Sequence, residues 1–418
     1  MAVSDGRPMT PPAATVAMPV QTATAVRKTA PRRLRNILSL NDFEAEAKRY
    51  LPKSVFAFVQ SGVENEVTLR DNREAFREWH VVPRVLVGVT QRSQQATLLG
   101  ETYDSPFGVA PMGMESLVGY RGDLMIAQAC AERNIPFIQS GASLIRLEDI
   151  RAACDTAWFQ AYLPIDFEDM RGLMNRVRNA GFKTLVITVD MTAGSNRENT
   201  ARAGFSAPFR PSWRMFFDGA THPAWSIGNF IRTIVQHGMP HFENLDAGRG
   251  AAIVSSGSRN TNRAGQNWAS LARIREEWKG NLVLKGVLNP ADVKPAVAAG
   301  VDGIIVSTHG GRQIDGVIPA VQALPGCVEA AGDVPVMIDS GIRRGTDVIK
   351  CLALGAKFCF IGRPFNYAAI FGQEGVAHGI DLLRTEISRD LGNMGINALS
   401  EITRDRIVPR GQHTRGLP

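Results

Sequence analysis

The segment STHGGRQIDG places a titratable base beside a fixed cation. His309 and Arg312 lie three residues apart, and the glycines between them leave the backbone open. Imidazole suits proton abstraction near neutral pH, and a guanidinium grips a carboxylate through two parallel hydrogen bonds. Together the two side chains indicate a substrate that is a 2-hydroxy or 2-keto acid.

Further polar residues follow the short apolar runs of the chain. A lone polar residue at such a place is usually a loop residue with a satisfied hydrogen bond. Several of them meet at one site if the runs are strands of a barrel, where active sites form at the carboxyl ends of the strands. Among them, Asp190 would orient the His309 ring and stabilise the imidazolium formed after proton abstraction. The set is Gln160, Tyr162, Thr188, Asp190, Lys285, Ser307 and Asp339.

Two glycine-arginine segments, DSGIRRGTD and FIGRP, predict a phosphate site. They follow the last two apolar runs, and the loops after the last two strands commonly bind phosphate in barrels. Glycine amides with Arg343 or Arg363 would hold a phosphate dianion. One such turn is usually only structural, but two on neighbouring final strands favour an anion site.

Eight apolar runs rich in β-branched residues predict the strands that position these side chains. Between most of them lie stretches with helical character, such as RGDLMIAQACAERN. Parallel strands need helical crossovers, and eight such units can close into a (β/α)8 TIM barrel; a doubly wound open sheet is the alternative. The runs are FGVAP (107), PFIQS (136), WFQAY (158), TLVITVD (184), LVLKG (282), GIIVS (303), VPVMIDS (334) and FCFIG (358).

The domain organisation follows from composition. Residues 1–34 form a basic tail rich in Ala, Pro and Thr, which we expect to be disordered, and residues 35–418 form one barrel domain. The barrel has a helical lead-in, SLNDFEAEAKRYLPKSVFAFVQSG, where Asn41 or Asp42 can cap a helix.

Charge and cysteine usage exclude several functional classes. The net charge is +7, but residues 1–35 carry +5 of it, so the remainder is nearly balanced and nucleic-acid binding is not expected. No run of 18 apolar residues and no secretory signal is present, so we expect a cytoplasmic protein without a spanning helix. The five scattered cysteines form no CxxC pair, and we expect no metal site and buried, reduced thiols.

A long insertion, about 197–265, separates the fourth and fifth predicted strands. Its segment 205–242 holds eight aromatic residues beside Arg210, Arg214 and Arg232. Aromatic rings beside arginines suit a peripheral contact with a membrane, on the inner face for a cytoplasmic protein. A packed lid over the site or an oligomer contact is the alternative.

From about Leu38 to Ile402 the chain resembles the FMN-dependent 2-hydroxy acid oxidases and dehydrogenases, the family of glycolate oxidase, lactate dehydrogenase and mandelate dehydrogenase. The matching motifs, in the family's order, are LPKSVFAFVQSG, FQAY, TVD, SNRE, LKGV, HGGRQID, DSGIRRGTDV and FIGRP. HGGRQID followed by DSGIRRG is highly specific.

The resemblance implies roles for single residues. His309 would be the base and Asp190 its partner, Arg312 the carboxylate clamp, and Tyr162 a hydrogen-bond donor to the substrate. Arg197 would lie on the substrate side, and Lys285 would face the N1 and O2 edge of the flavin, where its charge would stabilise the reduced cofactor. The cofactor FMN would be lined by Pro111, Met112, Gly113, Ser140, Gln160, Thr188, Lys285 and Ser307, and its tail and phosphate would be held by Asp339, Ser340, Gly341, Arg343, Gly362 and Arg363.

Three residues depart from the family's pattern. Phe58 stands where members usually have a tyrosine that helps to bind the substrate carboxylate, and a lost hydrogen bond to a charged group costs about 1.5–3 kcal/mol. A larger or more apolar substrate, or one that is not a free acid, would be consistent with this change. Thr308 replaces an asparagine of the base loop, and Gly113 replaces an alanine near the flavin.

We therefore expect an enzyme that oxidises a 2-hydroxy acid and passes electrons through FMN to a quinone or another acceptor. An oxidase that uses O2 and produces H2O2 would share the same residues. A biosynthetic flavin enzyme acting on an amine or a carrier-bound substrate, and a scaffold that has lost its chemistry, are further alternatives. The resemblance also implies a homo-oligomer, in particular a tetramer.

Overall fold

The computed structural model describes residues 30–162, 166–206, 208–210, 212–245, 247–248, 250–255 and 264–412. Residues 1–29 of the predicted tail lie outside the described residues. Residues 32–34 form a short 3-10 helix, and Ala30 and Leu34 are buried in the hydrophobic core. The folded part of the chain therefore includes residues that the sequence assigned to the end of the tail.

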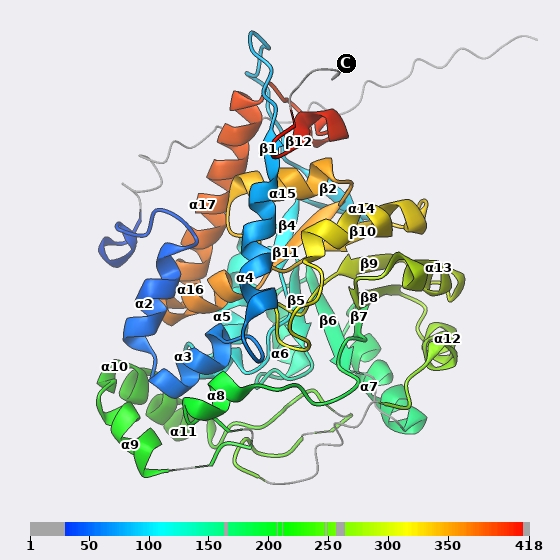
Figure 1. Cartoon of the computed structure of the whole chain (residues 1–418). Helices are drawn as coiled ribbons and strands as arrows, with labels where there is room; N and C mark the ends of the chain where they lie inside the picture. The colour runs from blue at the N-terminus through cyan, green and yellow to red at the C-terminus, as the bar shows by residue number, and fades with distance from the viewer. Residues whose placement is uncertain are drawn as a thin grey trace, which may run out of the picture.

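Eight parallel strands form a closed barrel at the centre of the molecule (Figure 1). Each predicted apolar run overlaps one of them, so the predicted (β/α)8 barrel is confirmed and the open sheet was the wrong alternative. Around the barrel the order is β10-β11-β4-β5-β6-β7-β8-β9, and β9 pairs with β10. The strands are β4 (Phe107–Val109), β5 (Phe137–Ser140), β6 (Ala157–Tyr162), β7 (Thr184–Thr188), β8 (Asn281–Val287), β9 (Gly303–Val306), β10 (Val336–Ile338) and β11 (Phe358–Ile361).

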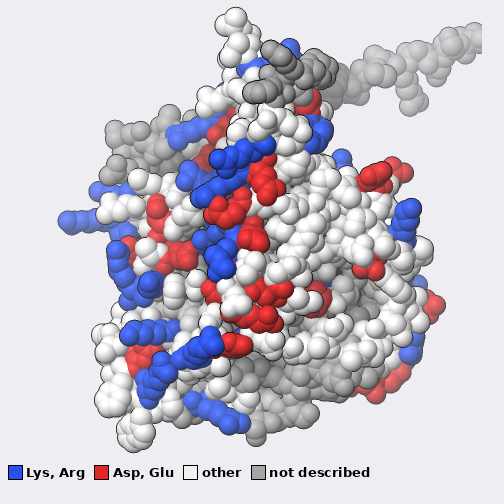
Figure 2. All heavy atoms as spheres, in the orientation of Figure 1, with Lys and Arg blue, Asp and Glu red and all other residues white. Residues whose placement is uncertain are grey.

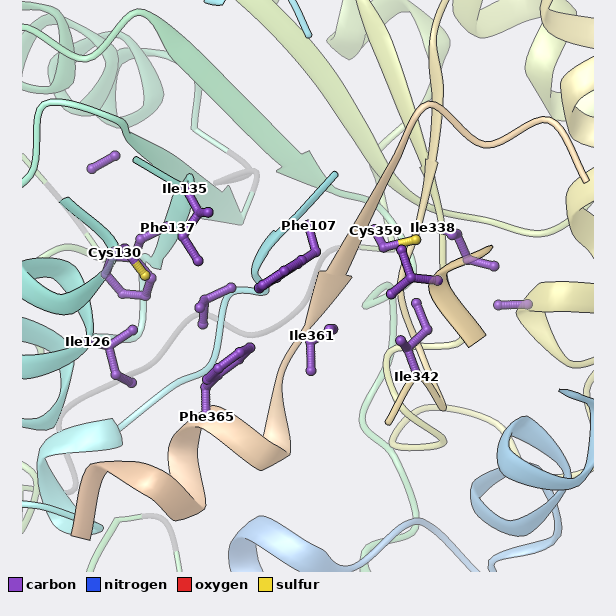
Figure 3. Packing of buried hydrophobic residues seen from close by; sticks show 14 of the residues in the cluster. Phe107, Ile126, Cys130, Ile135, Phe137, Ile338, Ile342, Cys359, Ile361 and Phe365 are labelled. Carbon is purple, nitrogen blue, oxygen red and sulfur yellow. The ribbon is translucent and has the colours of Figure 1, made fainter. Parts of the chain in front are cut away.

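Helices surround the barrel and bury its outer face. The main core lies between the strands and the helices. In Figure 3 the rings of Phe107 on β4 and Phe365 on α16 lie close to each other, and they stack with their centroids 6.4 Å apart. Burial of such apolar surface is the main favourable term in folding. The helices are α5 (Gly122–Glu132), α6 (Leu147–Ala153), α7 (Phe167–Asn179), α12 (Trp268–Glu277), α13 (Pro290–Ala298), α14 (Ala320–Ala331), α15 (Gly345–Ala353), α16 (Arg363–Ala368) and α17 (Gly372–Asn393).

A hairpin that the sequence analysis did not anticipate packs at the amino-terminal end of the barrel. It consists of β2 (Ala96–Leu98) and β3 (Glu101–Tyr103). Tyr103 accepts a hydrogen bond from Trp158 Nε1 at 3.2 Å and packs edge-on against Phe358. Another antiparallel pair joins β1 (Trp79–Val81) to β12 (Ile407–Pro409). These contacts leave the opposite, carboxyl end of the strands for the site.

The lead-in consists of α2 (Asp42–Tyr50) and α3 (Lys53–Gln60), followed by α4 (Val67–Glu74). Asn41 occupies the N-cap position of α2 but makes no capping hydrogen bond. Asp42 instead accepts hydrogen bonds from the backbone N–H groups of Leu38 and Ser39, at 2.8 and 2.9 Å. The predicted helix pair is present, and its first turn is held by Asp42 against the preceding turn rather than by an Asn41 cap.

The insertion folds into short helices, and its aromatic residues divide into two groups. Phe205, Trp225 and Phe242 are buried, whereas Trp213, Phe216 and Phe217 on α9 are 64–79% exposed. The insertion is tied to the lead-in, since the Asp218 carboxylate accepts hydrogen bonds from the first N–H groups of α3. The helices are α8 (Glu198–Arg202), α9 (Trp213–Ala220), α10 (Pro223–Trp225), a π-helix (Ser226–Ile231) and α11 (Arg232–His237).

The described surface is mixed in charge, as the sequence predicted for the folded part. Figure 2 shows Lys and Arg side chains interspersed with Asp and Glu over one face of the molecule, and uncoloured atoms dominate at its lower left, where Figure 1 places α9 and α10. All five cysteines are buried and unpaired, as expected. Among the described residues, no helix combines the length and apolarity needed to cross a bilayer.

Candidate active site

A cavity opens at the carboxyl end of the barrel strands. Its wall combines the loops after β4, β9, β10 and β11 with the end of α3, and this is where barrels place their active sites. Fourteen of the residues predicted for the site line the cavity. They are Phe58, Pro111, Met112, Gly113, Tyr162, Lys285, His309, Arg312, Asp339, Ser340, Gly341, Arg343, Gly362 and Arg363.

His309 and Asp190 form a hydrogen-bonded pair at the cavity wall. Nδ1 of His309 lies 3.0 Å from Oδ1 of Asp190. Because an ionised carboxylate only accepts, the proton lies on Nδ1, and Nε2 of the neutral ring is left as an acceptor. The backbone N–H of His309 donates to Ser307 Oγ at 2.9 Å, which holds the residue in a left-handed conformation with φ of 54°. The pair has the arrangement of a base with its orienting carboxylate.

Burial sets the protonation of this pair. It lowers the pKa of His309 below its ordinary value, and the attraction of Asp190 offsets this only in part while Lys285 adds to it. Burial opposes ionisation of Asp190, but its interaction with His309 and the positive charge of Lys285 outweigh burial and lower the pKa of that carboxyl. Asp190 is therefore ionised and His309 is neutral. A charged imidazolium would be desolvated at this place, and the Asp190 carboxylate compensates for that cost only in part. A neutral imidazole can accept a proton.

Gly286 makes room for the pair and was missed by sequence reasoning. It lies on β8, between the strands that carry Asp190 and His309, with φ of 109°. A Cβ at this position would lie 2.6–2.9 Å from the Asp190 side chain. The motif LKGV contains this glycine, but only the spatial order of the strands reveals why a side chain is excluded.

Lys285 carries a fixed positive charge inside the barrel. Its Nζ lies 2.9 Å from Asp339 Oδ2 and donates to Ser307 Oγ at 2.9 Å. Burial disfavours the ammonium, yet the carboxylates of Asp339 and Asp190 outweigh burial and raise the pKa of Lys285. The group therefore stays charged, and it faces the cavity, where a ligand can contact it.

Two arginines join the lead-in helix to the site. Arg312 donates to the carbonyl oxygens of Phe58 and Ser61, both at 2.8 Å, and Arg363 donates to Val59 and Gly310, both at 2.9 Å. These contacts place guanidinium groups at the carboxyl end of α3, where the helix dipole favours cations.

The cavity wall has an excess of buried positive charge, which suits anionic ligands. Burial and then the neighbouring guanidinium groups of Arg73 and Arg363 lower the pKa of Arg343 to about 9. Burial lowers the pKa of Arg312 as well, and Arg197 and Arg363 add to this through repulsion. An anion between such groups removes the repulsion and gains charge-assisted hydrogen bonds.

Phe58 connects the cavity to the insertion. Its ring stacks on the Phe205 ring with centroids 4.5 Å apart, and the Arg312 guanidinium carbon lies 5.2 Å from the centroid of the Phe58 ring.

Two further predicted residues make contacts behind the cavity wall or on the base loop. Arg197, which was expected on the substrate side, donates to Gln313 Oε1 at 3.3 Å and lies behind the wall. Thr308 accepts a hydrogen bond from Asn72 Nδ2 at 2.8 Å, so its hydroxyl holds the base loop against α4.

The remaining predicted residues lie behind the cavity wall rather than in it. Ser140 donates to Gln160 Oε1 at 3.1 Å, and Thr188 and Ser307 are buried at the ends of β7 and β9. Gln160 Nε2 is buried without a hydrogen-bond partner among the described residues. Since such a donor is costly to leave unpaired, it fits a cofactor with polar ring atoms. Sequence reasoning also missed Asn366, which lines the cavity and follows FIGRP by two residues.

Comparisons with known proteins find relatives along nearly the whole chain. The sequence model of the family described as FMN-dependent dehydrogenase matches residues 47–409. The chain is 34% identical to (S)-mandelate dehydrogenase of Pseudomonas putida over 380 residues, which is 90% of this chain and 95% of the relative. It is 37% identical to L-lactate dehydrogenase of Azorhizobium caulinodans over 381 residues, which is 89% of this chain and 98% of the relative.

Solved structures are similar along the same length. The structure of the monotopic membrane protein (S)-mandelate dehydrogenase matches with a TM-score of 0.82 and 34% identity, covering 90% of this chain and all of that one. The structure of mandelate oxidase with (S)-2-phenylpropionate matches with a TM-score of 0.73 and 30% identity, covering 88% of this chain and 97% of the other.

Replacement of Gly286 by alanine should separate Asp190 from His309. The new methyl group would overlap the carboxylate, so the ring would lose its attraction while staying desolvated, and the pKa of His309 should fall further. An NMR titration of the histidine rings measures this shift. Gly100→Ala is the control, because Gly100 also has a positive φ but no atom lies within 4 Å of a Cβ there. An unchanged His309 titration in Gly286→Ala would contradict the assigned pair.

Proposed function

The chain belongs to the FMN-dependent dehydrogenase family. We propose that it oxidises a 2-hydroxy acid to the 2-keto acid, with His309 as the base. The observation that carries the proposal is the contact of 3.0 Å between His309 and Asp190 at the wall of an arginine-rich cavity. Mandelate and lactate, which the relatives' names specify, are both 2-hydroxy acids.

The residues of the cavity fit FMN as the cofactor. The positive charge of the buried Arg343 and Arg363 suits the phosphate dianion of FMN. Lys285 and the Gln160 Nε2 atom, which has no partner among the described residues, suit the polar edge of the flavin ring. Bound FMN supplies the acceptor for two electrons from the substrate. Lys285 contributes a positive charge that Asp339 holds at 2.9 Å.

The remaining residues act on the substrate. Arg312 binds the carboxylate and Tyr162 donates to the same end of the molecule. The Nε2 atom of His309 accepts the hydroxyl proton, and Asp190 stabilises the resulting imidazolium. Arg197 supports the carboxylate site from behind the cavity wall, because its guanidinium donates to the Arg312 carbonyl oxygen at 3.5 Å.

We further propose that the acceptor is a membrane quinone, which makes the enzyme a dehydrogenase, and that α9 contacts the membrane. Trp213, Phe216 and Phe217 are exposed on this helix. Within residues 205–242 the single acidic residue, Asp218, is engaged by α3, while three arginines are present. An aromatic surface beside arginines suits an anionic bilayer. The alternative acceptor is O2, and the cytoplasmic location and the tetramer stay predictions.

The pH dependence of catalysis tests the base. Because burial lowers the pKa of His309, kcat/KM should be constant at neutral pH. It should fall only below the ordinary pKa of histidine, as acidification protonates the ring.

Two substitutions test the His309–Asp190 pair. Asp190→Asn removes the attraction that favours the imidazolium, so the acid limb of the pH profile should move to lower pH and kcat should fall about 10²–10⁴-fold. His309→Ala should lose activity to a similar extent without losing bound flavin. A His309→Ala enzyme as fast as its parent would overturn the assignment.

Phe58→Tyr tests the substrate pocket. The added hydroxyl can donate to the substrate carboxylate, which is worth about 1.5–3 kcal/mol, so KM for small acids such as lactate and glycolate should fall roughly 10- to 100-fold. Steady-state kinetics measure the change. A methyl ester of the same acid lacks the charge and should gain less. Equal gains for acid and ester would argue against a carboxylate at this end of the cavity.

Co-sedimentation with anionic phospholipid vesicles tests the membrane contact. Removing three exposed aromatic side chains, Trp213→Ala with Phe216→Ala and Phe217→Ala, should weaken vesicle binding on the order of 100-fold or more, because each buries apolar area in the interface. Ile314→Ala with Ile318→Ala, which removes exposed apolar side chains outside the insertion, is the control. If the triple variant sediments like its parent, α9 does not contact the membrane.

A further inference from the structure

A second cavity lies beneath the insertion, next to the active site. Its open volume is about 750 Å³. It is bounded by the loop between β4 and α5, the loop between β5 and α6, and residues 233–243 at the end of α11. None of the residues proposed for catalysis or cofactor binding lines it.

The same two stretches of main chain contribute to the walls of both cavities or connect them. Gly113 lines the active-site cavity, and its neighbour Met114 donates to the Ala142 carbonyl oxygen at 3.1 Å. A few residues farther along these two segments, Ser116 and Leu144 line the second cavity. A molecule bound there would lie beside the loop that faces the flavin.

The lining suits an uncharged ligand with an apolar body and polar ends. Leu144, Ile145, Met239 and Pro240 supply apolar surface, and His237 supplies a ring nitrogen. The charged residues of the wall cancel one another, with Arg121 and Arg146 set against Asp149 and Glu243. A balanced lining gives no net attraction for an anion such as a phosphate headgroup.

Two residues of the wall also carry a buried polar atom without a hydrogen-bond partner in the described part of the chain. Arg121 Nε and Thr233 Oγ1 are buried and find no hydrogen-bond partner among the described residues. A carbonyl oxygen is the complementary group, and a ligand that supplied one would remove the cost of these unpaired atoms.

The cavity can be reached from the proposed membrane side. The cavity ends at α11, and α11 follows directly on the π-helix. Exposed apolar residues recur at helical spacing along both helices: Ile227, Ile231 and Val235, each at least 50% exposed. One face of this segment is therefore available to a bilayer, while Thr233 and His237 on α11 line the cavity.

We propose that this cavity is the binding site of the electron acceptor, a quinone drawn from the membrane. The inference rests on the proposed function. A quinone has a flat apolar ring and two carbonyl oxygens, which match the lining. It would take up two electrons and two protons, equal to those that the substrate loses from its C–H and O–H bonds, and leave as a quinol while the keto acid is released from the other cavity.

Reoxidation of the reduced holoenzyme tests the site independently of the substrate. The flavin is reduced with dithionite, excess reductant is removed, and a short-chain benzoquinone is added without oxygen. The reoxidation rate of the parent should saturate with quinone concentration. Thr233→Trp fills the cavity and should slow reoxidation at least tenfold, whereas Thr221→Trp, at an exposed threonine of the same insertion, should not. Reoxidation by ferricyanide should be unchanged in both variants.

Met239→Trp, from another wall of the cavity, repeats the test if Thr233→Trp does not fold, and the bound-flavin spectrum reports folding. Reoxidation as fast as in the parent in a folded cavity variant would overturn the proposal. So would an equal loss with ferricyanide. If cavity variants lose vesicle binding but keep quinone reoxidation, a lipid headgroup occupies the cavity and the proposal is wrong. Because dithionite replaces the substrate, failure of the proposed 2-hydroxy acid oxidation would leave this result unaffected.

Discussion

The hydrogen bond between His309 and Asp190 is the contact on which the chemistry of this site depends. It joins the ends of β9 and β7, which are not neighbours in the barrel, across β8. The barrel register brings the two ends within reach, the absence of a side chain at Gly286 leaves room for the carboxylate, and the left-handed backbone of His309 turns the ring toward it. A change in any of these would leave a buried imidazole without its orienting partner, or a buried carboxylate without its cation.

A second constraint is the concentration of positive charge around the cavity. Lys285 is balanced by Asp339, but burial first and then repulsion from neighbouring guanidinium groups, Arg363 among them, lower the pKa values of Arg312 and Arg343. Backbone carbonyl oxygens at the end of α3 hold two of them. The protein thus maintains a cluster of cations that anionic ligands complete, which accounts for a carboxylate substrate and a phosphate-bearing cofactor in the same cavity. The lead-in helix is part of the site because its carbonyl groups orient the arginines.

Much of the fold could be predicted from the sequence, because buried parallel strands are short apolar runs and the residues at their carboxyl ends face one site. Gly286 could not be assigned a role, since its importance arises from two neighbouring strands. The Asp218 cap of α3 joins residues about 165 positions apart, and local spacing cannot reveal such a contact. The β2 and β3 hairpin is too short to give a hydrophobic pattern, and Asn41 resembled a cap because its residue type is favoured there.

The function proposed for the cavity is the oxidation of a 2-hydroxy acid. The most direct test mixes the purified flavoprotein, without oxygen, with mandelate, lactate, glycolate and longer aliphatic 2-hydroxy acids while the visible flavin absorption is recorded. At least one acid should bleach the flavin, and one molecule of 2-keto acid should form for each flavin that is reduced. A bound flavin that no 2-hydroxy acid reduces, although dithionite does, would contradict the proposed function.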